Sequence, residues 1–539
     1  MAQRSNAGPS EVTWWQRGVV YQIYPRSFMD ASGDGVGDLR GIVSRLDYLE
    51  WLGVDAVWIS PFYPSPMADF GYDVSDYTGV DPLFGTLSDF DRLLEEAHRR
   101  GIRVILDYVP NHTSDEHPWF VESRSSRENP KRDWYLWRDL APGGDPPNNW
   151  QSIFGGGSAW EWDEGTGQYY LHTFDVKQPD LNWRNPEVRE AMYGALRFWL
   201  DRGVDGFRID VLQALIKDNL FRDNPENLDW REGDPPWERQ IRLYSEDQPE
   251  MLEILREMRA VADSYGERVL IGELYLPLER MVSYYGPDLD GIHLPFNFGL
   301  VLLEEWEARA VGRLIEEYEA ALPKGAWPNW VLGHHDGPRI AGRVGEDRSR
   351  LVQMLLLTLR GTPTLYYGDE IGMRDVEIPP EMVRDPQGIR SPGYSRDPVR
   401  TPMQWDAGPN AGFCPPDVEP WLPVADDYAT TNVETQRDDP DSMLSFVRRL
   451  IWLRNELPAL TLGAYRPLEV GNDSVIAYLR EHDESRVLVA LNFGAESLEF
   501  PLDATGGDLL CSTRPDRTGG RADPSLKLGP YEGVILSLG

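Results

Sequence analysis

The stretch IRVILDYVPNH, residues 102–112, joins a mostly apolar run to a polar end. Its isoleucine, valine and leucine residues lack the strict alternation of a strand that faces water on one side. Such a run is typical of a strand in a parallel sheet that is covered on both faces. We therefore predict a buried parallel strand here, with Asp107, Asn111 and His112 at its carboxyl end.

Seven further runs of the same kind lie along the chain. They begin at Val19, Val54, Gly206, Val269, Gly291, Trp327 and Thr362. Amphipathic stretches with helical spacing lie between them, such as LSDFDRLLEEAHRRG at residues 87–101. Eight units of strand and helix predict an α/β fold, a (β/α)₈ TIM barrel.

Two parts of the chain depart from this pattern. Residues 113–183 are rich in Trp, Pro, Gly and Asn, and they are too many for one helix and its loops, so we predict an inserted subdomain B after the third strand. Near the C-terminus the pattern changes to short alternating strands, such as SVIAYLR at residues 474–480. The predicted domains are a barrel of residues 1–112 and 184–462, subdomain B of residues 113–183, and a C-terminal all-β sandwich of residues 463–539.

The composition limits the partners of the chain. A formal net charge of −36 argues against nucleic acid, anionic substrates and membranes, so a small neutral substrate fits best. No apolar run approaches the roughly 18 residues of a membrane span. The N-terminus lacks the apolar region of a secretory signal, so we expect a cytoplasmic monomer or homo-oligomer. Cys414 and Cys511 lie far apart and suggest no disulfide framework.

Charged residues follow several of the predicted strands, where the loops of a barrel build an active site. Asp210, Glu273 and Asp336 follow the fourth, fifth and seventh strands, so their carboxylates should point into one cleft. Arg208 precedes Asp210 by two residues on the same strand face and is expected to hold it ionised. Paired carboxylates in a cleft with abundant aromatic residues suit glycoside hydrolysis, in which one attacks the anomeric carbon and another protonates the leaving oxygen. No GxGxxG follows a strand and no GxxxxGK[ST] occurs, so we expect no organic cofactor.

The stretch DASGDGVGD, residues 30–38, has the spacing of a cation-binding loop. Five oxygen donors occupy alternate positions: Asp30, Ser32, Asp34, the Val36 carbonyl and Asp38. With Gly35 at the turn, they follow the first nine positions of an EF-hand loop, although the twelfth position is Gly41 rather than Glu. We predict a bound Ca²⁺; the alternative is a turn rich in Gly and Asp that binds no metal.

Eight motifs together carry a family resemblance: DYVPNHTS, GFRID, GEL, HHDGPR, QPDLNW, GVDAVWISPF, GTPTLYYGDEIGM and RTPMQWD. With them the chain resembles glycoside hydrolase family 13, the α-amylase family, and within it the group of α-glucosidases and oligo-1,6-glucosidases, over essentially its whole length. The resemblance implies a retaining, exo-acting α-glucosidase on short oligosaccharides, with some transglucosylation. It also implies that the Ca²⁺ ion is structural and lies away from the chemistry.

The resemblance assigns roles to the three carboxylates. Asp210 is implied as the nucleophile, Glu273 as the general acid and base, and Asp336 as the group that stabilises the transition state through the 2- and 3-hydroxyls of the sugar. A retaining enzyme of this kind is expected to hold Asp210 and Glu273 about 5–5.5 Å apart.

Further positions match the substrate-binding residues of the family. They are Asp69, Tyr72, His112, Gln178, Arg208, His335 and Arg400. Tyr72 is expected to stack under the sugar ring, and Asp69 and Arg400 to bind the hydroxyls at the non-reducing end. His112 and His335 are expected to bond hydroxyls of the same glucose, so His335 and Asp336 are interpreted as sugar ligands rather than metal ligands.

Some positions leave alternatives open. His334 stands where the family usually has Asn, and the sequence gives it no role. Val211, after Asp210, tends to accompany α-1,6 activity in relatives, whereas residues 212–230 look more like those of broad-preference α-glucosidases. An oligo-1,6-glucosidase, a sucrose or trehalulose hydrolase and a glucoside isomerase therefore remain alternatives, although the RLDRD loop of sucrose isomerases is absent. A catalytically silent relative is a remote alternative.

Overall fold

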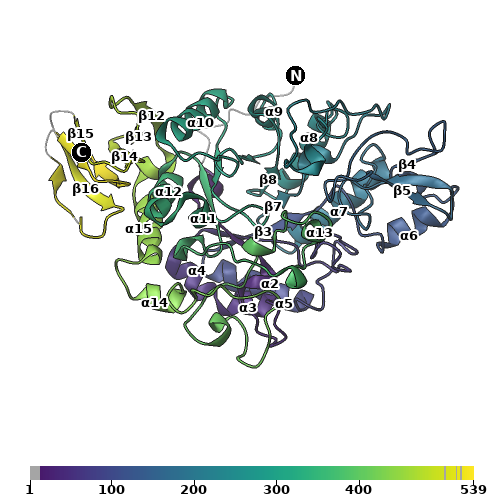
Figure 1. Cartoon of the computed structure of the whole chain (residues 1–539), viewed down its shortest axis with the longest axis horizontal. Coiled ribbons are helices and arrows are strands. Elements are labelled where there is room, and N and C mark those ends of the chain that lie inside the picture. Colours follow the sequence, from purple (N-terminus) through teal and green to yellow (C-terminus); the bar gives the residue numbers. More distant parts are fainter. Residues whose placement is uncertain (1–11, 503–505, 518, 523–524, 539) are drawn as a thin grey trace, which may run out of the picture.

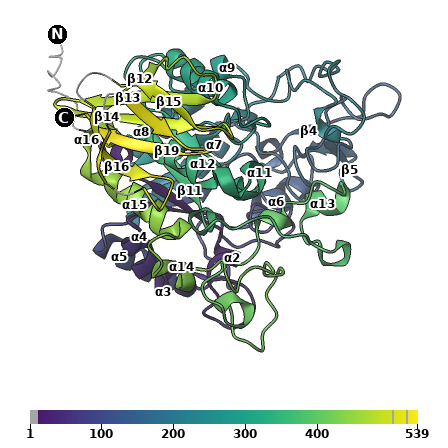
Figure 2. The ribbon, with the colours of Figure 1, turned by 60° about the vertical axis from the view of Figure 1, so that its left-hand side comes forward.

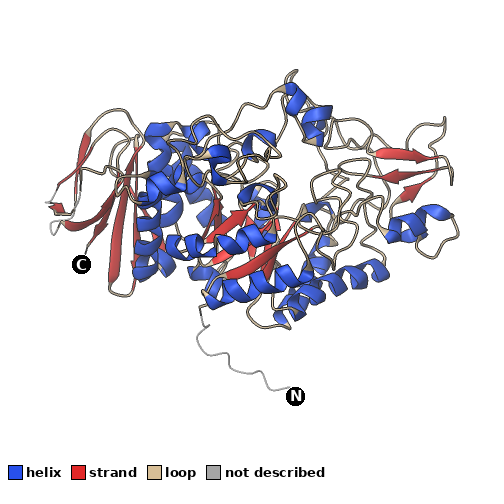
Figure 3. Cartoon of the chain, turned by 90° about the horizontal axis from the view of Figure 1, so that it is seen from below, coloured by secondary structure: helices blue, strands red, loops and turns tan. Residues whose placement is uncertain are grey.

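A computed structural model describes residues 12–502, 506–517, 519–522 and 525–538. Its centre is an eight-stranded parallel sheet. The strands are β1 (Val20–Ile23), β2 (Ala56–Ile59), β3 (Arg103–Tyr108), β7 (Gly206–Ile209), β8 (Val269–Glu273), β9 (Leu294–Phe296), β10 (Asn329–Val331) and β11 (Thr362–Tyr366). They neighbour one another in the order β10, β11, β1, β2, β3, β7, β8, β9, and β9 lies next to β10 at the remaining seam, so the barrel is nearly closed. The predicted (β/α)₈ fold is confirmed (Figure 3).

Helices surround the strands (Figures 1 and 3). The longest are α5 (Leu87–Arg99), α7 (Pro186–Asp201), α8 (Met251–Asp263), α10 (Ala308–Ala321), α12 (Glu346–Thr358) and α15 (Met443–Glu456). Shorter ones are α1 (Trp14–Arg17), α2 (Pro25–Phe28), α3 (Leu39–Ser44), α4 (Leu46–Leu52), α9 (Leu278–Ser283), α11 (Ile340–Val344), α13 (Pro386–Arg390), α14 (Val433–Arg437) and α16 (Pro458–Leu462). All residues of β1, β2, β7, β8 and β11 are buried, which explains why their sequences do not alternate.

Helix α5 shows how local sequence positions these elements. Thr86 caps its N-terminus by accepting a hydrogen bond from the Asp89 N–H, and the Asp89 side chain accepts one from the Thr86 N–H in return. Phe90, Leu93 and Ala97 then share one face at helical spacing, and all three are buried. The capped end and the apolar face together fix where the helix begins and how it packs on the barrel.

Between β3 and β7 the chain forms a lobe at one end of the molecule (Figure 1). It contains α6 (Pro118–Ser125) and an antiparallel sheet of β4 (Trp137–Arg138), β6 (Gln168–Leu171) and β5 (Trp160–Asp163), in that order. The Lys217 ammonium, from the loop after β7, ties the lobe to the barrel. It lies 2.5 Å from the Asp180 carboxylate of the lobe and donates a 2.7 Å hydrogen bond to Asn111 of the barrel.

The C-terminal part contains two antiparallel sheets, visible at the front of Figure 2. The larger has the order β12 (Ala464–Leu468), β13 (Val475–His482), β14 (Ser485–Asn492), β19 (Gly533–Ser537), β16 (Gly507–Ser512), β17 (Arg521–Ala522). The smaller pairs β15 (Leu498–Pro501) with β18 (Ser525–Leu528). Leu479 and Leu488 of the larger sheet share an apolar cluster with Phe500 and Leu526 of the smaller one, so the sheets pack face to face.

A long irregular segment, residues 367–432, connects β11 to α14 with only short helices, and Gln387 and Arg396 of this segment line the cavity at the mouth of the barrel. One of these helices, η6 (Asp397–Val399), is flanked by Arg396 and Arg400. Among the described residues, no helix combines the length and the apolar character needed to cross a bilayer.

Candidate active site

The carboxyl ends of the barrel strands bring the predicted catalytic residues together. Glu273 is the last residue of β8, Asp210 directly follows β7, and Asp336 lies in the turn after β10. All three line one cavity of about 860 Å³. Asp69, Tyr72, His112 and His335 line the same cavity. Gln178, Arg208 and Arg400 lie behind its wall and hydrogen-bond to residues that line it.

Arg208 joins the carboxylates of three strands. It is 1% exposed, and its Nη1 donates hydrogen bonds of 2.8 Å to both Asp107 and Asp210. Its Nη2 lies 2.7 Å from Oε2 of Glu273. The same Oε2 accepts a 2.8 Å hydrogen bond from the Val211 N–H. One buried guanidinium therefore fixes the positions of Asp210 and Glu273 relative to each other.

The turn after Asp210 adopts an unusual backbone conformation. Val211 has φ of 36° and ψ of 48°, in the left-handed region that β-branched residues rarely occupy. This conformation allows its N–H to reach Glu273. Strain of this kind persists where the surrounding structure holds it, and it is common at functional sites.

Two of the carboxyl groups beside Arg208, those of Asp107 and Asp210, have pKa values above their usual range. Burial raises the pKa of Asp107 to about 6, although Arg208 opposes the shift. Burial also raises the pKa of Asp210 well above its usual range; Arg208 opposes the shift, and the charges of Glu273 and Asp107 add to it. Arg208 therefore lowers the pKa of Asp210, as expected from the sequence, but does not cancel the effect of burial.

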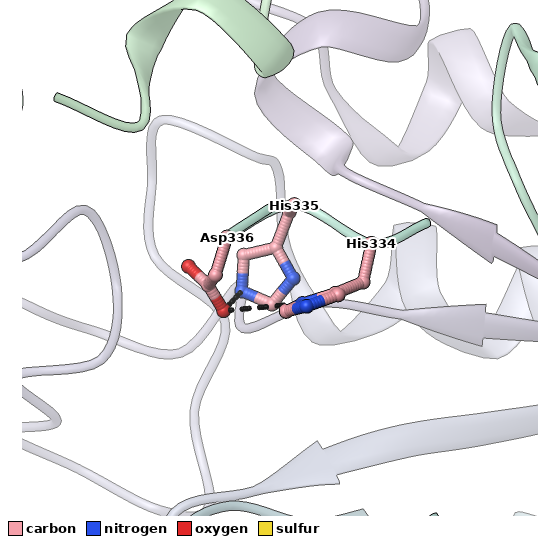
Figure 4. Close-up of side chains that lie close together, drawn as sticks. All are labelled: His334, His335 and Asp336. Atoms are coloured by element: carbon pink, nitrogen blue, oxygen red, sulfur yellow. Dashed lines mark ion pairs between the residues drawn. The ribbon is translucent and has the colours of Figure 1, made fainter. Parts of the chain in front are cut away.

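Asp336, in contrast, is surrounded by hydrogen-bond donors and positive charges. His334 and His335 lie beside it (Figure 4), and two arginines contact its carboxylate. Its Oδ2 lies 3.2 Å from Nε2 of His335 and 3.6 Å from Nδ1 of His334. Its Oδ1 accepts hydrogen bonds of 2.6 Å from Arg400 and 3.3 Å from Arg396. Burial alone would raise the pKa of this carboxyl, but His335, His334 and the two arginines together hold it well below its usual range. Asp336 is thus an ionised acceptor at the cavity.

Neutral histidines complete this wall. Nε2 of His335 lies 2.7 Å from the Tyr72 hydroxyl, and the two rings stack with centroids 5.4 Å apart and planes 6° apart. Burial lowers the pKa of His335 well below its usual range. Burial also lowers the pKa of His112 to about 4, and its Nε2 lies 3.1 Å from Nε2 of Gln178. Both imidazoles are therefore uncharged near neutral pH, with fixed hydrogen-bonding partners.

Asp69 and Arg400, both expected at the non-reducing end of the sugar, do not contact each other. The partner of Asp69 is Arg396, whose Nη2 donates a 2.7 Å hydrogen bond to Oδ1 of Asp69 and which lines the cavity. Arg400 is fully buried and donates instead to the His335 carbonyl and to Asp336. The two arginines stand on either side of helix η6, so the chain turns between them and they reach different carboxylates. The sequence-based analysis missed Arg396.

Among the described residues, one group of three His, Cys, Asp or Glu side chains brings its ligand atoms within 4.8 Å of one another: His334, His335 and Asp336. Two arginines already contact the carboxylate of this group and oppose a bound cation by charge repulsion. We therefore keep the interpretation of His335 and Asp336 as ligands of a neutral molecule.

Comparisons with known proteins agree with this geometry. The family model described as alpha amylase, catalytic domain, matches residues 22–463, and that described as maltogenic amylase, C-terminal domain, matches residues 465–535. A probable alpha-glucosidase of Rhizobium meliloti is 43% identical over 91% of this chain and 91% of its own. An oligo-1,6-glucosidase of Heyndrickxia coagulans is 40% identical over 97% of this chain and 99% of its own.

Solved structures are similar over almost the whole chain. The alpha-glucosyl transfer enzyme XgtA superimposes with a TM-score of 0.92 at 42% identity, over 98% of this chain and 100% of its own. The trehalulose synthase MutB of Pseudomonas mesoacidophila superimposes with a TM-score of 0.89 at 36% identity and the same coverage.

Proposed function

The chain belongs to the α-amylase family of glycoside hydrolases, and from this premise we propose that it is a retaining, exo-acting α-glucosidase. The observation that carries the proposal is the placement of Asp210 and Glu273 on adjacent strands, joined by Arg208 and facing one cavity. A carboxylate pair of this kind supports double displacement at an anomeric carbon.

In the proposed reaction Asp210 attacks the anomeric carbon of a bound glucoside while Glu273 gives its proton to the leaving oxygen. Oε2 of Glu273 accepts a hydrogen bond from the Val211 N–H and is paired with Nη2 of Arg208, which leaves Oε1 to carry the proton. Water then attacks the glucosyl ester as Glu273 takes up a proton. Asp336, held ionised by His335 and the arginines, accepts hydrogen bonds from the sugar hydroxyls and stabilises positive charge on the ring.

The proposed exo action rests on the wall formed by Asp69 and Arg396. Their charges are paired at the cavity wall, where Asp69 is buried and the Arg396 side chain is 11% exposed, and a terminal glucose can satisfy both through its hydroxyls. A longer chain would have to extend past this pair and leave it without a partner, which is costly in a buried site.

We expect maltose and isomaltose to be cleaved far faster per bond than soluble starch, with glucose as the product from the first minutes. Chromatography of early products measures this. Starch cut internally at a rate comparable to that of disaccharides would contradict a closed pocket. The same assay with sucrose, trehalose and kojibiose decides between α-glucosidase, oligo-1,6-glucosidase and sucrose-type action.

Arg396→Ala should lower kcat/KM for every α-glucoside. The loss should be about 10- to 100-fold, which corresponds to the roughly 1.5–3 kcal/mol of a hydrogen bond to a charged group. The reason is that every substrate has the same terminal glucose, which we expect to contact Asp69 and Arg396. Arg374→Ala is the matched control, because Arg374 is exposed and pairs with Glu346 outside the cavity. A drop confined to one disaccharide would show that Arg396 does not contact the common glucose.

We also propose a structural Ca²⁺ at residues 30–38, from the spacing of their oxygen donors. The carboxylates of Asp30, Asp34 and Asp38 do not all lie within 4.8 Å of one another in the described structure, so binding would draw them together. Asp30 accepts hydrogen bonds from the Gly33 and Gly35 N–H groups, and Asp38 accepts them from Ala31, Ser32 and Gly41. These bonds close the loop and leave further lone pairs on carboxylate oxygens, which Ca²⁺ prefers. Asp34, which is exposed, would complete the set with the Val36 carbonyl and Ser32.

Chelation should therefore lower the melting temperature by about 2 °C or more, with little change in turnover per folded molecule, and added Ca²⁺ should reverse the shift. Asp34→Ala should abolish this response of the melting temperature. The loop should stay folded, because Asp30 and Asp38 still accept their hydrogen bonds from backbone N–H groups. A melting temperature that responds neither to chelator nor to added Ca²⁺ would count against the site.

A cytoplasmic location stays a prediction from the sequence.

A further inference from the structure

Gln22, a polar residue of strand β1, contacts the histidine of the proposed glucose site from behind the cavity wall. Its side chain is fully buried and does not line the cavity. Its Nε2 lies 2.8 Å from Nδ1 of His335, whereas its Oε1 has no hydrogen-bond partner among the described residues. An unpaired buried oxygen costs stability, so packing alone does not account for a glutamine at this position.

The ring of His335 is oriented by its neighbours. It stacks with Tyr24 and with Tyr72, at centroid distances of 5.6 and 5.4 Å, and these contacts restrict the plane of the ring. Within that plane Nδ1 faces Gln22, and Nε2 lies 2.7 Å from the Tyr72 hydroxyl and 3.2 Å from Oδ2 of Asp336 (Figure 4). A neutral imidazole has one proton, so one nitrogen donates a hydrogen bond and the other accepts one.

Three neighbours determine which nitrogen of His335 carries the proton. The amide Nε2 of Gln22 can only donate, so Nδ1 must accept. The Tyr72 hydroxyl donates to Oδ2 of Asp107 at 3.1 Å, which leaves its oxygen to accept from Nε2 of His335. Asp336 is ionised and can only accept. All three contacts require the tautomer with the proton on Nε2.

Resting on the proposed α-glucosidase function, we propose that Gln22 is a positioning residue, which donates to Nδ1 of His335 and so fixes the proton of that ring on Nε2. The hydrogen bond at one imidazole nitrogen sets the protonation of the other. With the proton on Nδ1 instead, Nε2 would direct a lone pair at the Asp336 carboxylate. It would also take the Tyr72 hydroxyl away from Asp107.

The consequence for the reaction follows from the proposed role of Asp336. This carboxylate stabilises positive charge that develops on the sugar ring, so its orientation matters most in the transition state. Gln22 acts on it through His335 and does not touch the sugar. Loss of the Gln22 hydrogen bond should therefore lower kcat more than it raises KM.

The tautomer can be measured directly by nitrogen-15 NMR of enzyme labelled at histidine, without substrate and slightly above neutral pH. Protonated and bare ring nitrogens differ widely in chemical shift, and the signals of His335 are those that disappear in His335→Ala. We expect a protonated Nε2 and a bare Nδ1 in the wild-type enzyme, and a larger share of the other tautomer in Gln22→Met. A bare Nε2 in the wild type, or an unchanged tautomer in Gln22→Met, would overturn the inference.

Kinetics measure the effect on the reaction. Gln22→Met keeps the length of the side chain and removes the hydrogen bond, so kcat on an aryl α-glucoside should fall by about 3- to 10-fold. The melting temperature should not fall, because the substitution also removes the unpaired Oε1. Gln353→Met is the matched control: Gln353 of α12 is fully buried, has no side-chain partner among the described residues and lies outside the cavity. It should retain full kcat, and an equal loss in both variants would contradict a specific role of Gln22.

A double-mutant cycle shows whether Gln22 acts through His335. In a His335→Ala background, Gln22→Met should change kcat by less than about twofold, because the partner of the amide is already gone. The same loss in both backgrounds would mean that Gln22 acts by another route, and the inference would fail. The NMR measurement needs no substrate, so absence of turnover on every α-glucoside would overturn the proposed function separately.

Discussion

Asp210→Asn is expected to lower turnover of every α-glucoside by about 10⁴-fold or more, the loss seen when a catalytic nucleophile is removed. An amide cannot form the glucosyl ester, so the first step has no acceptor for the anomeric carbon. The fold should survive, because Arg208 keeps its contacts with Asp107 and Glu273. Removing one of three clustered carboxylates also relieves their mutual repulsion.

The measurement is kcat on an aryl α-glucoside together with a thermal melt. Asp201→Asn is a suitable control, since Asp201 ends helix α7 on the surface, outside the cavity, and its side chain accepts a hydrogen bond from the Tyr265 hydroxyl. It should retain full activity. A folded Asp210→Asn enzyme with near-normal turnover would remove Asp210 from the reaction.

Glu273→Gln is expected to show a loss that depends on the leaving group. Because glutamine cannot donate a proton from Oε1, turnover of maltose should fall by about 10²- to 10⁴-fold, the usual contribution of a general acid. α-Glucosyl fluoride needs little protonation to leave, so its first step should be affected much less. The amide oxygen can still accept the hydrogen bonds from Arg208 and the Val211 N–H, which preserves the geometry.

Steady-state rates on the two substrates test this directly. The same loss for maltose and for glucosyl fluoride would show that Glu273 acts by position or charge rather than as the acid. A loss on neither substrate would exclude it from the chemistry.

The barrel could be predicted from sequence because its strands are covered on both faces. That burial leaves nearly continuous apolar runs, and the polar residues at their ends, such as Asp210 and Glu273, are brought to one mouth by the parallel arrangement. Asp336 could be placed by the same reasoning, since it follows β10 in the turn that reaches the cavity.

The partner of Asp69 could not be predicted in this way. Arg396 and Arg400 lie four residues apart in an irregular segment without a hydrophobic period to fix their directions. Only the turn of η6 sends Arg396 to Asp69 and Arg400 to Asp336.

The raised pKa of Asp210 also depends on the three-dimensional arrangement. From the sequence Arg208 is only a neighbour of Asp210, whereas in the fold burial and two further carboxylates outweigh its charge.

The central claim is that Asp210 forms a covalent glucosyl intermediate, and the configuration of the first product tests it most directly. Two displacements at the anomeric carbon return it to its starting configuration. Proton NMR during the first minutes of hydrolysis of an α-glucoside should therefore show α-glucose, with β-glucose appearing only as mutarotation proceeds. β-Glucose as the first-formed product would mean a single displacement by water and would contradict the account.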